Sequence, residues 1–414
     1  MSHLEEKTET LHATNHYLYY PDEKNVPPYL AYGFRPIFLL LAPYMVLNIL
    51  LWGLVWSGIL AIPFMENVLI WHLYEMIFGI LTAGIMAFLT TGLPELFPGT
   101  VPFIGKRLKY IMILWLAGRV SFWFIDITGM YLAAALNLSM LAWLIYFARD
   151  AVLDKLQRHA SLGYAMLGLL IIETWFFASM AGFATTVPME ILKIALAASV
   201  ILILLALRRV NMEAINELME DKGIDDVYIS RPPLTNLAIF CVALFSGVEF
   251  FAPNASALGW IGFATGAAFF AITGDYILKD KSILNQPYVL YLGLVFILFG
   301  VGYALLGWAI LAQQTQHLSH FRHFIASGGL GLAYLMVMII ISWIHTGRHL
   351  HANMYTHMMV TCIVFATVLR SFVGVLEMPS LYLVSSILWV IPFVLYMRVF
   401  FGFLLNPRAD GIKG

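Results

Sequence analysis

Charge and cysteine are both scarce in this sequence of 414 residues, and each scarcity excludes a class of protein. Only 11% of the residues are charged and the formal net charge is −1, so no basic field points to a nucleic-acid partner. The two cysteines, Cys241 and Cys362, both lie inside apolar segments, which argues against a disulfide framework. We expect no cleavable signal peptide, because the first apolar run begins only after Arg35.

Hydrophobic residues are abundant instead, at 61% of the chain, and they form membrane-length runs. We count twelve such segments: 36–60, 68–92, 107–125, 127–148, 160–186, 189–207, 235–252, 257–278, 288–312, 322–344, 354–376 and 381–405. The sequence therefore predicts an all-α polytopic protein of the lipid bilayer, with one transmembrane domain over 35–405. Polar tails at 1–34 and 406–414 flank this domain. One long connection, 208–234, separates the sixth and seventh segments.

Basic residues predict how the chain is oriented in the membrane. Of the 23 lysines and arginines, 19 fall in the tails and the even-numbered connections, and only Lys193 and Arg322 fall in odd-numbered ones. Positive residues favour the cytoplasmic side, so we predict that both termini are cytoplasmic. In a bacterium this would be the inner membrane.

The stretch from Trp71 to Gly79 opens the second predicted span and carries polar residues that such a span seldom holds. His72, Glu75 and Met76 stand at helical spacing, so they share one face of a helix. A carboxylate one turn inside a membrane segment is expensive, which favours a metal, haem or proton-handling site. The simpler alternative is an interfacial histidine and glutamate that cap the helix.

Histidines fall at two depths under this orientation. His72, His320 and His323 lie at the outer side, whereas His345 and His349 lie at the inner side. The tenth span joins the two levels, because His323 begins it and His345 ends it. A histidine before glycine and arginine is also typical of an ordinary helix C-terminus, so capping remains the alternative for His345.

Besides Glu75, the ionisable residues Arg119, Glu173, Glu249 and Arg370 lie well inside predicted spans. Each is a candidate functional residue, with mutual ion pairing as the alternative. An arginine at such a depth could pair with a glutamate or hold a haem carboxylate with two hydrogen bonds.

Several motifs resemble the NnrS family. They are Tyr32-Gly33-Phe34-Arg35-Pro36, Trp71-His72-x-x-Glu75-Met76-x-Phe78-Gly79, Gly118-Arg119, His323-x5-Gly329-x-Gly331 and His345-Thr346-Gly347-Arg348. The resemblance implies a twelve-span membrane protein that contains haem and copper and is linked to nitric oxide metabolism and nitrosative stress in denitrifying bacteria. Two departures indicate a divergent member. The family's second histidine in the second span is Tyr74 here, and the family's glycine-rich motif after the sixth span is reduced to Arg209-Val210.

The resemblance implies a b-type haem, or a haem with copper, that acts on nitric oxide or on a metal–nitrosyl product. At the outer side we expect His72 and His323 as haem ligands and His320 as a further metal ligand. Arg119 or Arg370 would balance the propionates, and Glu75 and Tyr74 are the candidate catalytic residues. At the inner side we expect a second metal or haem on His345 and His349, near Arg348. Because Tyr74 replaces one family ligand, haem is a firmer expectation than copper.

Two other function classes stay open from the sequence. Six plus six spans around a central loop also suit a secondary transporter. However, the second cytoplasmic connection lacks the charged glycine motif of the common twelve-span superfamily. A haem–copper reductase is the third alternative, although no His-His dipeptide occurs. The sequence does not determine the electron donor or the oligomeric state.

Overall fold

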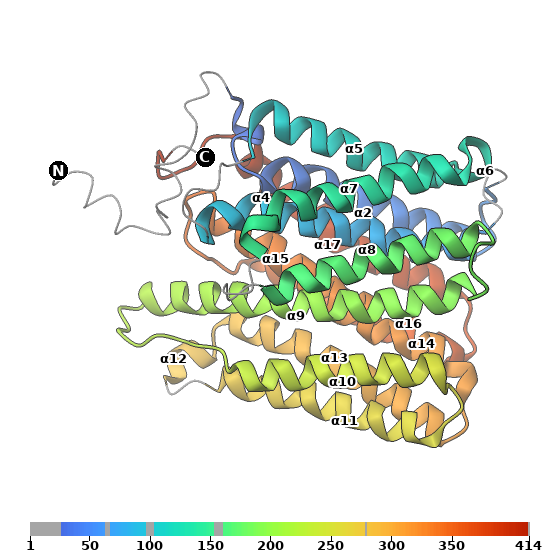
Figure 1. Cartoon of the computed structure of the whole chain (residues 1–414). Helices are drawn as coiled ribbons and strands as arrows, with labels where there is room; N and C mark the ends of the chain where they lie inside the picture. The colour runs from blue at the N-terminus through green and yellow to red at the C-terminus, as the bar shows by residue number, and fades with distance from the viewer. Residues whose placement is uncertain (1–25, 63–66, 97–102, 153–159, 278–279, 413–414) are drawn as a thin grey trace.

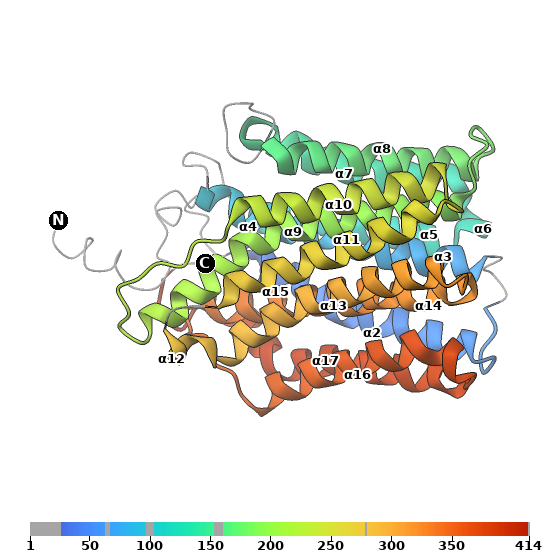
Figure 2. The same ribbon diagram turned by 90° about the horizontal axis from the view of Figure 1, so that it is seen from below.

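The chain forms a bundle of long helices in the computed structural model, which describes residues 26–62, 67–96, 103–152, 160–277 and 280–412 (Figures 1 and 2). The described residues hold only helices and connecting turns, with no strand. Eleven helical segments among them are long and apolar enough to cross a membrane. The predicted all-α membrane fold is confirmed. The tail prediction for residues 1–25 lies outside the described residues.

The helices follow the predicted spans closely. The first half of the chain contains α2 (Phe34–Trp56), α3 (Val68–Tyr74), η3 (Glu75–Gly79), α4 (Ile80–Leu96), α5 (Gly105–Trp123), α6 (Ile125–Thr128), α7 (Met130–Val152), α8 (Ala160–Met180) and α9 (Pro188–Glu220). The second half contains α10 (Pro232–Phe251), α11 (Ser256–Ile272), η4 (Thr273–Tyr276), α12 (Lys281–Leu284), α13 (Pro287–Leu311), η5 (Thr315–His317), α14 (Leu318–His323), η6 (Phe324–Leu330), α15 (Gly331–Ile344), α16 (Met354–Leu376) and α17 (Ser380–Leu405). A short turn, η2 (Pro28–Leu30), precedes α2.

Two helices differ from their predicted spans in an instructive way. The third predicted span, 107–125, is present as the 19-residue helix α5. It is not among the eleven candidates because Lys106, Arg107, Lys109 and Arg119 make it less apolar. Helix α9 is 33 residues long, because it continues beyond the sixth span into the connection that we predicted. Pro232 then starts α10 at a position where a missing backbone N–H is harmless.

The second and tenth spans occupy the interior of the bundle. Among the candidate spans, Val68–Leu93 and Thr315–Ile344 have the largest buried shares. Each contains a π-helical turn, η3 in the second and η6 in the tenth. Such turns are rare and often mark functional sites. The two motif-bearing spans are thus central and share an unusual backbone feature.

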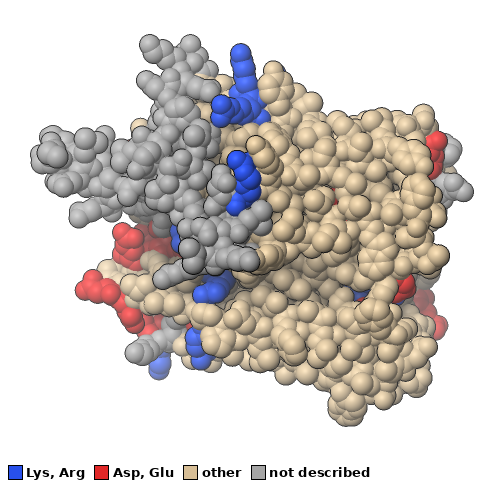
Figure 3. All heavy atoms as spheres, viewed as in Figure 1, with Lys and Arg blue, Asp and Glu red and all other residues tan. Residues whose placement is uncertain are grey.

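The two described chain ends meet at one end of the bundle, drawn at the left in Figure 1. Nη1 of Arg35, at the start of α2, donates a 2.6 Å hydrogen bond to the carbonyl of Asn406, just after α17. On the face seen in Figure 3, lysines and arginines gather toward this same end. Following the predicted orientation, we call this end "inner" and the opposite end "outer".

Candidate functional site

Three histidines and one arginine interact at the outer end of the bundle, where α3 and α14 lie (Figure 2). Nη1 of Arg370, on α16, donates a 3.0 Å hydrogen bond to Nδ1 of His320, on α14. The Arg370 charge also acts on the His72 and His323 rings, and those two rings interact electrostatically with each other. We call His72, His320, His323 and Arg370 the outer cluster. The fold therefore joins the histidines of the second and tenth spans, as the sequence predicts.

His72 is buried, and its surroundings hold the ring in one orientation. The imidazole stacks on Trp52 of α2, with ring centroids 3.9 Å apart and planes 4° from parallel. Nδ1 of His72 is buried and has no hydrogen-bond partner. A buried polar atom without a partner is destabilising, so this nitrogen would gain from a bound ligand.

His323 is arranged as metal-binding histidines usually are. Its Nδ1 donates to the carbonyl of Ser319, one turn earlier, at 2.8 Å. This bond leaves Nε2 as the nitrogen that can bind a metal, and it orients the ring. Among the described residues, however, no three nitrogens of the outer cluster lie within 4.8 Å of one another. The outer cluster therefore does not form a three-ligand site around one small ion.

Glu75 belongs to a separate buried network, one turn further into the membrane. Oε2 of Glu75 accepts hydrogen bonds from Nη1 of Arg119 at 2.8 Å and from the hydroxyl of Tyr44. The other side of the guanidinium donates to Asn137. Glu75 is 0% exposed and Arg119 is 3% exposed, so both charges are removed from solvent. Of the two predicted propionate partners, Arg119 is therefore engaged here and Arg370 lies in the outer cluster.

Two glycines of the sequence motifs make this network possible. A Cβ on Gly79 would lie 2.4 Å from Oε2 of Glu75 and 2.7 Å from Nη1 of Arg119. A Cβ on Gly118 would lie 2.7 Å from Oδ1 of Asn137. Real Cβ atoms do not approach other atoms so closely, so the small residue is needed at both positions.

Tyr74 faces a different helix from His72. Its hydroxyl donates a 2.7 Å hydrogen bond to Oε1 of Glu173, on α8. Its ring stacks on Phe122 and Phe176, with centroids 3.7 Å and 5.0 Å away. The residue that replaces the family's second histidine thus completes a buried tyrosine–carboxylate pair, and it does not point into the outer cluster.

At the inner end, His345 sits between a phenol and a carboxylate. Its Nδ1 lies 3.1 Å from the hydroxyl of Tyr32, and its Nε2 lies 3.4 Å from Oε1 of Glu213, on α9. The ring is 3% exposed and also packs against Phe34. The Tyr32-Gly33-Phe34 motif therefore serves to hold His345.

The loop after His345 is fixed by the C-terminal segment. Gly347 has a φ of 72°, and a Cβ there would lie 2.4 Å from the Asp410 carboxyl carbon. Nη1 of Arg408 donates to the His345 carbonyl at 3.1 Å, and Arg408 also pairs with Asp410. Arg348 lies over the Phe403 ring at 4.1 Å and donates to the Thr346 carbonyl at 3.0 Å. This explains the glycine of the His345-Thr346-Gly347-Arg348 motif, since only glycine adopts this backbone conformation readily.

His349 lies in a separate environment on the surface. Its Nδ1 is 2.9 Å from Oδ1 of Asp221 and 3.7 Å from Oε1 of Glu217, both near the end of α9. These three residues are the one group of at least three histidine, cysteine or acidic ligands within 4.8 Å of one another in the described part of the chain. His345 is not part of it. The two histidines that we expected to share a ligand cluster therefore have different partners.

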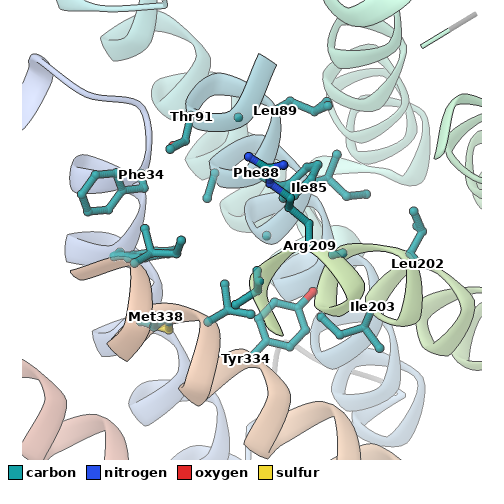
Figure 4. A pocket seen from close by; sticks show the side chains of 18 of the residues that line it. Phe34, Ile85, Phe88, Leu89, Thr91, Leu202, Ile203, Arg209, Tyr334 and Met338 are labelled. Atoms are coloured by element: carbon teal, nitrogen blue, oxygen red, sulfur yellow. The ribbon is translucent and has the colours of Figure 1, made fainter. Parts of the chain in front are cut away.

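An apolar pocket has His345 in its lining, and Figure 4 shows part of it, with Arg209 and Tyr334 among the labelled side chains. It encloses about 1050 Å³ of space that no atom fills, part of it open to the surroundings. Side chains of α2, α4, α8, α9 and α15 line it, and nearly all of them are apolar. Its polar lining residues include Arg209, Glu213, Tyr334 and His345.

A comparison with protein-family models identifies the relatives of this chain. The model described as NnrS protein matches residues 28–408, which is nearly the whole sequence. The chain belongs to the NnrS family. No curated protein and no solved structure matches it. Family membership supports a membrane protein with a function related to nitric oxide.

The sequence of this NnrS protein did not reveal several partners of the site residues. Tyr44 and Trp52 lie two turns apart on α2, where they contact Glu75 and His72. They look like ordinary aromatic residues of a membrane helix. The sequence pointed only weakly to Asn137 and Glu213 as partners of the site, through an amide inside a span and an acidic residue near the end of one. Only the packing of α2, α7 and α9 showed what these residues contact.

Proposed function

We propose that the chain binds a b-type haem at the outer cluster, that His72 and His323 would hold it, and that the protein acts on nitric oxide. The observation that carries the proposal is that two imidazoles from the central spans interact electrostatically with each other and with Arg370, and that each is followed within three residues by a π-helical turn. Neutral imidazole is a common axial ligand of haem iron. The membership in a family linked to nitric oxide supports the same reading.

The residues of the outer cluster fit such a group. Nδ1 of His72 is a buried atom that lacks a partner, and the Nδ1 bond of His323 leaves Nε2 available. Arg370 supplies a positive charge within reach of both rings, which suits a propionate. When bound, the haem would supply a redox centre for reactions of nitric oxide.

The buried network next to the cluster would handle protons. Reduction of nitric oxide consumes protons, and acidic side chains inside a membrane commonly relay them. The Tyr44–Glu75 and Tyr74–Glu173 pairs are each hydroxyl–carboxylate contacts, and both carboxylates are 0% exposed. Oε1 of Glu75 and Oε2 of Glu173 are buried without a hydrogen-bond partner, so each carboxyl has a place for a proton. Glu75 and Tyr74 would then act as proton carriers beside the outer cluster.

The test is haem content and visible absorbance of the purified protein. We expect wild type to contain haem, and we expect His72→Ala and His323→Ala each to lose it or to shift its absorbance strongly. His357→Ala is the matched control, because His357 contacts Tyr291 and lies outside the outer cluster. Unchanged spectra in both outer variants would refute the ligand assignment. Nitric oxide titration of the wild-type protein then tests the substrate.

The His349 group supports a second, smaller proposal, a metal ion at the inner end. One imidazole and two carboxylates suit a harder divalent ion better than reduced copper, which prefers sulfur ligands. Metal analysis of wild type against His349→Ala tests it. Equal metal content in the two proteins would show that His349 only pairs with its acidic neighbours.

A further inference from the structure

We propose that the apolar pocket binds an anionic phospholipid of the inner leaflet, with the phosphate at Arg209 and one acyl chain between α4, α9 and α15. No residue of the outer cluster lines this pocket, so the inference does not depend on the proposed haem. It also gives a role to the Arg209-Val210 pair, which the proposed function does not use.

Arg209 is the charged residue of the pocket that lacks a partner. It is the only lysine or arginine in the lining, and no residue in the described ranges forms a hydrogen bond or an ion pair with it. Glu213, by contrast, lies 3.4 Å from Nε2 of His345, and Nδ1 of His345 lies 3.1 Å from the Tyr32 hydroxyl. A guanidinium can bind a phosphate group with two parallel hydrogen bonds. The cationic group of this pocket is therefore suited to a phosphate.

The depth of Arg209 matches the phosphate groups of the inner leaflet. Helix α9 begins at Pro188, near the outer end of the bundle (Figure 1). The stretch from Pro188 to Arg209 corresponds to about 31 Å of helix. The hydrocarbon core of a bilayer is about 30 Å thick. Arg209 thus lies at the inner boundary of the hydrocarbon layer, where anionic lipids attract arginine side chains.

Next to Arg209, the α9 wall of the pocket is apolar. Leu202, Ile203, Ala206 and Val210 line it, and their helical spacing places them on the face that carries Arg209. Among the lining residues Arg209 alone is exposed, whereas the others are buried or half-buried. Figure 4 shows Arg209 among the apolar side chains of the pocket. The pocket therefore has an accessible positive charge beside an enclosed apolar interior, as an acyl chain with an anionic head requires.

Other occupants would use only part of the pocket. A free inorganic anion would bind Arg209 and leave the apolar walls uncovered. Water finds few polar partners there, and apolar cavities stay dry. A neutral molecule with hydroxyl groups would have to displace Tyr32 or Glu213 from His345.

Native mass spectrometry of the full chain in detergent tests the proposal, with dioleoyl phosphatidylglycerol added back to delipidated protein. We expect one saturable adduct per wild-type chain. Ala206→Leu should weaken the affinity about tenfold, because the larger side chain excludes about two methylene groups of the acyl chain. Arg209→Met should weaken the affinity severalfold. Dioleoylglycerol has the same chains and no phosphate, so its weaker binding should be the same in wild type and Arg209→Met.

Each variant has a matched control on α9. Ala198→Leu adds the same volume two turns away from Ala206, and Arg208→Met removes a neighbouring charge at the same depth as Arg209. Neither Ala198 nor Arg208 lines the pocket, so both controls should bind the phospholipid as tightly as wild type. Arg209→Met changes an exposed side chain, so it keeps the test valid if Ala206→Leu fails to fold.

The outcomes separate this inference from the proposed function. The lipid site would be overturned by the absence of a saturable adduct in wild type, by equal affinities of Arg209→Met and Arg208→Met, or by equal affinities of Ala206→Leu and Ala198→Leu. Loss of haem in Ala206→Leu but not in Ala198→Leu would also overturn it, because the pocket would then hold haem. A wild-type protein that binds the phospholipid and contains no haem would refute the proposed function and leave the lipid site standing.

Discussion

Replacing Arg119 by Met tests whether the buried ion pair with Glu75 supports the second span. The two charged atoms are 2.8 Å apart, and the side chains are 4% and 0% exposed. At an effective dielectric constant of about 20, their attraction is about 6 kcal/mol before desolvation is subtracted. Removal of one partner of a buried pair typically destabilises a protein by about 3–5 kcal/mol, because the other charge is left buried alone.

We therefore expect Arg119→Met to lower the free energy of unfolding by about 3 kcal/mol. Glu75 would keep the Tyr44 hydrogen bond, so the loss should fall at the lower end of that range. Glu75→Gln in the same background removes the unpaired charge. The destabilisation of the double variant should then be smaller than the sum of the destabilisations of the two single variants.

The assay is unfolding of the detergent-solubilised protein by a denaturing detergent, followed by helix content. Arg322→Met is the matched control, because Arg322 pairs with Glu249 at a more exposed position, 18% and 12% exposed. That variant should lose less stability, since solvent screens the pair better. Two results would contradict a supporting role of the ion pair. One is a decrease in the free energy of unfolding below about 1 kcal/mol for Arg119→Met, and the other is a double variant whose destabilisation equals the sum of the two single destabilisations.

Two further predictions concern the ends of the bundle. Cysteine reporters at Lys281 and Glu377 should be labelled from the cytoplasmic and the outer side respectively, and the reverse pattern would invert the orientation used above. Partial burial works against ionisation of Asp410, but the hydrogen bonds and charge of Arg408 lower its pKa overall. The stabilisation that this carboxylate gives the C-terminal segment should be complete above its unfolded pKa of about 3.9 and lost as the pH falls through the lower folded value. Protease protection of the C-terminus measured from pH 6 to pH 3 should show this loss, and Asp410→Asn should remove the pH dependence.

The helical membrane fold could be predicted from the sequence because lipid imposes a simple rule. A chain that crosses the hydrocarbon layer must satisfy its own backbone hydrogen bonds and be apolar over about 20 residues. Both demands are visible in composition and segment length, so the spans were predicted closely. Helix α5 shows where this rule is less clear, because three lysine and arginine residues near one end make the helix less apolar than the candidate spans.

The motifs predicted which helices matter, but not what each side chain contacts. His72, Glu75 and Met76 were expected on one helix face, and α2 indeed lies against His72 and Glu75 through Trp52 and Tyr44. Helical spacing specifies a direction only relative to the helix itself. Which neighbour stands there depends on how the other helices pack.

The sequence by itself therefore determined the class of fold, the order of the spans and the histidine-bearing second and tenth helices. Only the tertiary structure decided that His72 and His323 meet with Arg370, that Arg119 pairs with Glu75, and that His345 and His349 have separate partners. The physical reason is that hydrophobicity and helical periodicity belong to a single segment of the chain, whereas an ion pair or a ligand site needs residues from two segments. Residues from distant spans become neighbours only through packing, and packing depends on small residues such as Gly79 that admit a side chain from another helix.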